Sequence, residues 1–94
     1  MADDALLVVR VFTHPACGGC GVAVKAAWQL REHHPDVTLR TVSLDSKEGL
    51  DEAHAEHITT IPTTILSRGS QEVARWVGAT TPAVLETAFT EATR

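Results

Sequence analysis

The spacing of apolar residues changes along the first half of the chain, and each spacing predicts a different element. A dense apolar and β-branched run at residues 6–12 predicts a strand that is buried on both faces. Over about residues 18–33, apolar residues recur at intervals of three and four, which predicts a helix whose apolar face includes Val22 and Trp28. Residues 37–44 then predict a second strand.

Capping and turn residues divide the next part of the chain. Asp45 or Ser46 can cap a short helix over about 47–56. Residues 61–66 lead into a third strand, and a Ser-Arg-Gly-Ser turn connects it to a returning strand over 71–77. This segment therefore predicts a helix followed by a β-hairpin.

A last helix closes the pattern. Thr80 or Thr81 can cap it, Pro82 fits its first turn, and Val84 and Phe89 are among the residues expected to face inward. The predicted order is β-α-β-α-β-β-α. Its opening strand–helix–strand unit implies a parallel pair with a right-handed crossover, and its hairpin implies antiparallel strands. We therefore predict an α/β fold of three layers, a mixed four-stranded sheet with helices on both faces.

Length and charge narrow the class of protein. The 94 residues suit a single domain over 1–94, with residues 1–4 expected to form a disordered tail. The net charge is −4 and Lys and Arg are not clustered, so nucleic acid is not an expected partner. The acidic start and the short apolar run at 5–9 match neither a signal peptide nor a membrane span. We expect a cytoplasmic protein.

The two cysteines form the motif Cys17-Gly18-Gly19-Cys20, placed where the first predicted strand passes into a helix. Backbone N–H groups and the helix dipole at such a junction favour negative charge, which lowers a thiol pKa and favours the attacking thiolate. Two cysteines this close in a cytoplasmic protein are more often catalytic or metal-binding than structural. The motif therefore indicates thiol–disulfide chemistry.

Other uses of the same cysteines stay open at this point. Cys17 and Cys20 could instead bind a soft metal such as Cu(I), Hg(II) or Zn(II) in a metal-binding or metal-transfer module, although zinc sites usually need a second ligand pair. Only His54 and His57 approach a finger-type spacing, and they are one residue too close. A pair of inert buried cysteines, or an adaptor that only binds proteins, are further alternatives.

Three motifs in order give the chain a resemblance to the thioredoxin superfamily, over about residues 6–92. The first is the C-x-x-C motif after a strand. The others are Thr60-Ile61-Pro62-Thr63, which resembles the family's cis-proline loop, and Trp76-Val77-Gly78-Ala79, which leads into the last helix. The resemblance implies a thioredoxin-like fold and a redox enzyme without cofactor or metal. It implies that Cys17 is the nucleophile and Cys20 the resolving thiol, and that substrate contacts come from Gly18, Gly19, Ile61 and Pro62.

The resemblance also implies the partners: substrate proteins that contain disulfides, and an external reductant of the thioredoxin-reductase type, a flavoenzyme, acting on a monomer. The chain departs from the family in three places near the dithiol. Ala16 replaces the usual Trp, Gly18-Gly19 replaces the usual Gly-Pro between the cysteines, and Val11 replaces a buried acid six residues before the first cysteine. Without that acid, the proton of Cys20 needs another route, through water or with the help of His14.

Overall fold

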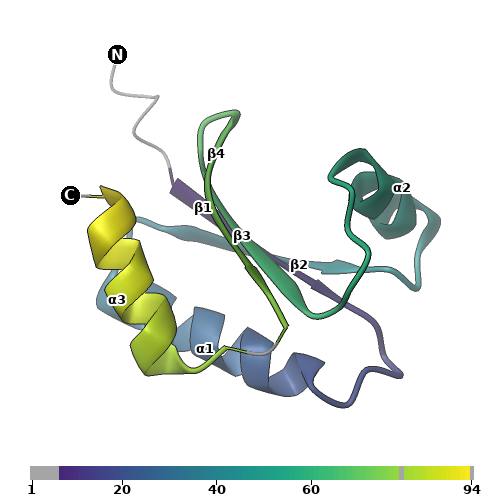
Figure 1. Cartoon of the computed structure of the whole chain (residues 1–94), viewed down its shortest axis with the longest axis horizontal. Coiled ribbons are helices and arrows are strands. Elements are labelled where there is room, and N and C mark those ends of the chain that lie inside the picture. The colour runs from purple at the N-terminus through teal and green to yellow at the C-terminus, as the bar shows by residue number, and fades with distance from the viewer. Residues whose placement is uncertain (1–6, 79, 94) are drawn as a thin grey trace.

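A mixed four-stranded sheet forms the middle layer of the molecule, with helices on both faces (Figure 1). The computed structural model describes residues 7–78 and 80–93, so the predicted tail at 1–4 lies outside the described residues. The predicted order of elements and the mixed sheet are confirmed. The elements are β1 Leu7–Thr13, α1 Cys20–His33, β2 Thr38–Ser43, α2 Lys47–Ala55, β3 Thr63–Arg68, β4 Gln71–Val77 and α3 Pro82–Thr93.

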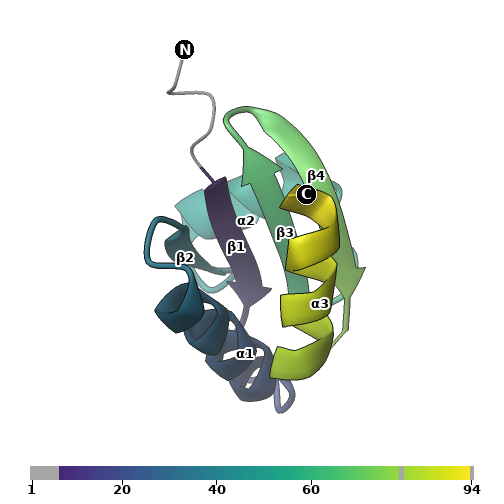
Figure 2. The same cartoon turned by 90° about the vertical axis from the view of Figure 1, so that its left-hand side faces the viewer.

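The strand order β2-β1-β3-β4 explains the composition of the first strand. β1 pairs in parallel with β2 on one side and antiparallel with β3 on the other. In Figure 2, α1 and α3 lie in front of the sheet and α2 lies behind it. Because β1 is central and covered on both faces, nearly every position of its run can be apolar. No helix in the described part of the chain is long and apolar enough to cross a membrane.

The larger core lies between the sheet and the layer of α1 and α3. Its buried members are Leu7, Val9, Val11, Ala23, Ala26, Ala27, Leu30, Val37, Leu66, Leu85 and Phe89. Three residues expected on inward faces are instead exposed, at 52% for Val22, 49% for Trp28 and 53% for Val84. In α1 the alanines face the sheet, and such small side chains let a helix approach closely, so the buried stripe is narrower than the periodicity suggested.

Ion pairs between side chains cover part of the sheet face that lies under α2. In the register of the strands, Arg10 of β1 lies beside Arg40 of β2 and Ile65 of β3, and Ile65 lies beside Arg75 of β4. Three arginines therefore share one row across this face. We call this set the arginine row. A smaller apolar cluster of Phe12, Val42, Ala53 and Ile65 completes the face.

Glutamates from α2 and β4 neutralise the arginine row. Arg10 donates to Glu52 at 2.7 Å and to Glu56 at 2.9 Å, and Arg40 donates to Glu52 at 3.1 Å. Arg75 donates to Glu72 at 2.8 Å. Burial would raise the pKa of Glu52, but the hydrogen bonds from Arg40 and Arg10 outweigh it and hold that pKa below its usual range. Glu52 thus joins α2 to both β1 and β2.

From this geometry we predict that the charge of Glu52 stabilises the fold at neutral pH and that this stabilisation is lost in acid. A carboxyl whose pKa is lowered by folding stabilises the protein above its unfolded pKa, and the effect is lost as the pH falls through the folded pKa. We expect Glu52→Gln to lower the free energy of unfolding by about 1–2 kcal/mol at pH 7, and by much less near pH 2.5. Urea unfolding at both pH values measures this difference.

Asp51→Asn is the matched control for Glu52→Gln. Asp51 is the neighbouring carboxylate on α2, it is exposed, and it pairs with the exposed Lys47 at 3.1 Å. Its loss should change stability by less than about 0.5 kcal/mol at either pH. A cost for Glu52→Gln that stays the same from neutral to acid pH would contradict the role of its charge.

Candidate functional site

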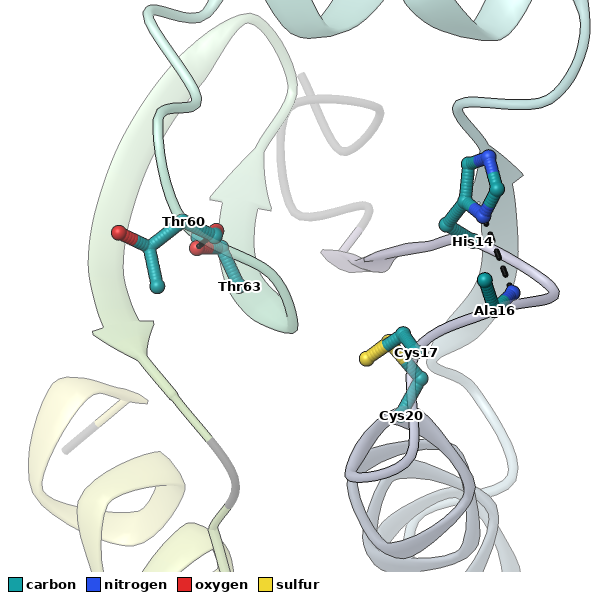
Figure 3. Close-up of a disulfide and its surroundings, with 6 residues drawn as sticks. All are labelled: His14, Ala16, Cys17, Cys20, Thr60 and Thr63. Atoms are coloured by element: carbon teal, nitrogen blue, oxygen red, sulfur yellow. Dashed lines mark hydrogen bonds between the residues drawn. A yellow bond between two sulfur atoms is a disulfide. The ribbon is translucent and has the colours of Figure 1, made fainter.

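The two cysteines lie at the end of the sheet where β1 leads through a loop into α1 (Figure 3). They form a disulfide, with their Cα atoms 5.5 Å apart. The helix begins at Cys20, two residues later than predicted, and Gly19 is its N-cap residue. Glycine has a low helix propensity, so Gly18 and Gly19 remain in a turn before the helix. The Cys20 N–H closes this turn by donating to the Cys17 carbonyl at 3.5 Å.

The later helix start changes the place of Cys17. The sequence placed it at the helix N-terminus, whereas in the structure it lies in the loop just ahead of the first turn. Unpaired backbone N–H groups of that turn still lie next to the dithiol, because the disulfide ties Cys17 to the first helical residue. The helix start therefore remains a source of positive potential for a thiolate.

The two cysteines differ in their exposure to solvent. Cys17 is half-buried in the loop, whereas Cys20 is only 5% exposed. A bulky partner therefore reaches Cys17 more easily than Cys20. This asymmetry agrees with the sequence-based roles of nucleophile and resolving thiol, which themselves stay predictions.

The Ile61–Pro62 loop approaches the C-x-x-C motif at Gly19. Its peptide bond is cis, and a Cβ atom added to Gly19 would lie 3.9 Å from Cδ of Pro62. The sulfur atoms point toward this loop in Figure 3, where Thr60 and Thr63 mark its two ends. The side chain of Ile61 packs against the smaller core cluster. Of the predicted substrate-contact residues, the structure thus places Gly19 and Pro62 together; Gly18 is exposed on the outer side of the turn.

An open cavity of about 420 Å³ lies on the β2 side of the dithiol. Its lining residues are Thr13, His14, Pro15, Cys17, Cys20, Gly21, Val24, Thr41 and Ser43. Thr41 and Ser43 were not among the residues predicted from the sequence, because only the parallel pairing of β2 with β1 brings them here. The rule that ligand sites gather at the carboxyl ends of parallel strands was the signal that could have found them.

Two residues near the dithiol, Val11 and His14, bear on the route of the Cys20 proton. Val11, in place of the family's acid, is fully buried in the larger core. His14 is half-buried, and its Nδ1 accepts a hydrogen bond from the Ala16 N–H at 3.0 Å. Among the described residues, no group of three or more His, Cys, Asp or Glu side chains is arranged to hold a metal ion. The site thus gives the metal-binding alternative no support.

Comparison with known proteins agrees with the geometry. The thioredoxin family model matches residues 1–91. Thioredoxin from Fasciola hepatica is 26% identical, with a TM-score of 0.81 over 96% of this chain and 84% of that one. Mitochondrial thioredoxin 3 from Saccharomyces cerevisiae is 27% identical, with a TM-score of 0.77 over 90% of this chain and 77% of that one.

A third structure, thioredoxin O2 from Arabidopsis thaliana in the oxidised state, shares the fold. It is 24% identical, with a TM-score of 0.84 over 98% of this chain and 79% of that one. No curated protein sequence matches this chain. The evidence for the family therefore comes from its sequence model and from solved structures.

Proposed function

The chain belongs to the thioredoxin family, and on that premise we propose that it reduces disulfide bonds in proteins with the dithiol of Cys17 and Cys20. The family supports thiol–disulfide oxidoreductase activity in general. One observation carries the finer proposal: the two sulfurs form a disulfide in which one cysteine is half-exposed and the other buried, and Gly19 between them lies close to Pro62.

The reaction proceeds in two exchanges. The Cys17 thiolate attacks one sulfur of a substrate disulfide, so a Cys17–substrate disulfide forms and the other substrate sulfur leaves as a thiolate that takes up a proton. Cys20 then loses its proton, and its thiolate attacks Sγ of Cys17. The mixed disulfide breaks, the second substrate sulfur leaves and is protonated, and the Cys17–Cys20 disulfide holds the oxidised state. The substrate has gained two electrons and two protons.

The surroundings of Cys17 suit an extended protein segment. Pro15 and Ala16 are exposed beside it. Across the Pro62 loop, the Gly78 N–H donates to the Pro62 carbonyl at 2.7 Å, and the neighbouring Val77 is 65% exposed. This low-charge rim can contact a polypeptide while the backbone of Ile61 pairs with it by strand addition.

The remaining partners follow from the same proposal. An external reductant of the flavoenzyme type supplies the two electrons that restore the dithiol, and the protein acts as a monomer in the cytoplasm. Glutathione is not its proposed reductant. In the glutaredoxin pattern, paired glycines followed by acidic residues would hold glutathione, and this chain has Val77-Gly78-Ala79-Thr80 in their place.

An equilibrium redox titration of the purified protein tests the function directly. We expect the Cys17–Cys20 disulfide to open and close reversibly, with a midpoint between roughly −270 and −120 mV, the range of related oxidoreductases. Thiol alkylation after equilibration in glutathione or dithiothreitol buffers reports the fraction oxidised. A pair that never closes, or that is isolated with a stoichiometric metal, would refute the proposal.

A further inference from the structure

His14 supplies two of the hydrogen bonds that hold the loop carrying Cys17. The His14 carbonyl accepts the Cys17 N–H at 2.9 Å, and the His14 ring accepts the Ala16 N–H at 3.0 Å. Just before the loop, the Leu44 N–H donates to the Thr13 carbonyl at 2.8 Å, which fixes the start of the loop to the end of β2. After Cys17 come two glycines, which add little stiffness. The position of Cys17 therefore depends strongly on His14.

The bond to Ala16 defines the state of the His14 ring. A backbone N–H can only donate, so Nδ1 must offer a lone pair, and the single ring proton of neutral imidazole is then on Nε2. Protonation would place a second N–H at Nδ1, where it would face the Ala16 N–H and abolish the bond. In this loop conformation His14 is therefore neutral.

The same bond argues against His14 as the base that deprotonates Cys20. The only lone pair of the neutral ring is already engaged by Ala16, and the ring points away from the sulfur atoms (Figure 3). Among the described residues that line the cavity beside it, the only other titratable groups are the two cysteines; no charged side chain faces the ring across this space from β1, α1 or β2. The ring's effect on the dithiol thus comes through the backbone.

We propose that His14 is a positioning residue for Cys17 and that it acts only as neutral imidazole, so that Cys17 reacts more slowly when His14 is protonated. This inference rests on the proposed function, because it concerns the nucleophile of that reaction. Histidine is the side chain whose charge changes within the range of about pH 5 to 8, so the test compares rates across that range.

The test is the rate at which iodoacetamide alkylates Cys17 in the reduced protein, with the modified residue identified by peptide mass spectrometry. His14→Asn is the decisive variant, since the Asn side-chain oxygen can accept the same N–H in an Asx turn but does not titrate. His14→Ala removes the acceptor. At pH 8 we expect His14→Asn to react within about twofold of the wild type, and His14→Ala about 2–10-fold more slowly, the effect of one hydrogen bond.

The alkylation rate of Cys17 in the wild type, divided by that in His14→Asn, should then fall from near one at pH 8 to about 0.1–0.5 at pH 5.5. A merely structural role would leave that ratio unchanged with pH, which would overturn the inference. A ratio that rises above one in acid would also overturn it, because a histidinium would then be stabilising the thiolate by its charge. If His14→Ala does not fold, the pH dependence of the Asn ratio alone decides.

This test is separable from that of the proposed function. Iodoacetamide needs no disulfide substrate, so the His14 effect can fail while the redox titration succeeds. Conversely, a dithiol that never cycles refutes the function whatever the alkylation rates show.

Discussion

The Cys20→Ser variant is expected to accumulate stable mixed disulfides on Cys17, whereas Cys17→Ser is expected to lose disulfide reduction down to the uncatalysed level. Cys17 is the half-exposed member of the pair, so it meets the substrate first. Cys20 is 5% exposed and forms a disulfide only with Cys17 in this structure. Removing it leaves the first exchange intact and blocks the second, which makes the intermediate long-lived.

The measurement is non-reducing electrophoresis after incubation with a disulfide-bonded protein such as insulin, with peptide mapping of the captured species. Wild type should show reduced substrate and no lasting adduct, and the adduct of Cys20→Ser should disappear on addition of dithiothreitol. Adducts that form on Cys20 in the Cys17→Ser variant, at a rate equal to those on Cys17, would mean that the two roles are reversed or shared.

A second large effect is expected at Gly49, in the first turn of α2. A Cβ atom at this position would lie 1.8 Å from the carbonyl oxygen of Ser43 and 2.8 Å from its carbon. Both are backbone atoms at the end of β2, so neither can rotate away. Gly49 also donates its N–H to the capping oxygen of Ser46 at 3.0 Å, which fixes its distance from the strand. Alanine must therefore displace α2 from the sheet.

We expect Gly49→Ala to lower the free energy of unfolding by roughly 3 kcal/mol or more, at the upper end for overpacking. For a domain of this size that corresponds to a fall in Tm of about 12–24 °C. Gly21→Ala is the matched control, because Gly21 is also helical and a Cβ there meets nothing within 4 Å. It should stabilise the protein by about 0.5–1 kcal/mol. Equal thermal stability of the two variants would contradict the close contact of α2 with β2.

Much of the fold could be predicted because its signals are local. The apolar run of β1, the capping serine of α2 and the turn before β4 each lie within a few residues of the element they define. The start of α1 could not be placed correctly, since two glycines inside the motif weaken the helix there. The width of the buried face of α1 was overestimated as well. Trp28 and Val22 fit the helical period, but the sheet is contacted by the alanine side of the helix.

The candidate site also has residues that could be predicted from the sequence and residues that could not. Cys17, Cys20 and Pro62 could be named because their spacing and order resemble a family. Thr41 and Ser43 reach the cavity through the pairing of β2 with β1, and the arginine row exists only in the register of four strands. No motif records such contacts between distant segments. The bond from Ala16 to His14 spans two residues, but it depends on the ring orientation, which composition does not reveal.

The arginine row gives the two faces of the sheet different responses to salt. The layer of α1 and α3 is attached by apolar area, which excluded salts such as sulfate strengthen. The attachment of α2 through Glu52 and Glu56 is ionic in part, and mobile ions weaken it. Such salts therefore strengthen the apolar contacts on both faces, whereas the ionic contacts that they weaken, already partly shielded by burial, lie on the α2 face. Since residues 56–62 connect α2 to β3, the ionic strength of the surroundings acts on the segment that ends at Pro62, beside the dithiol.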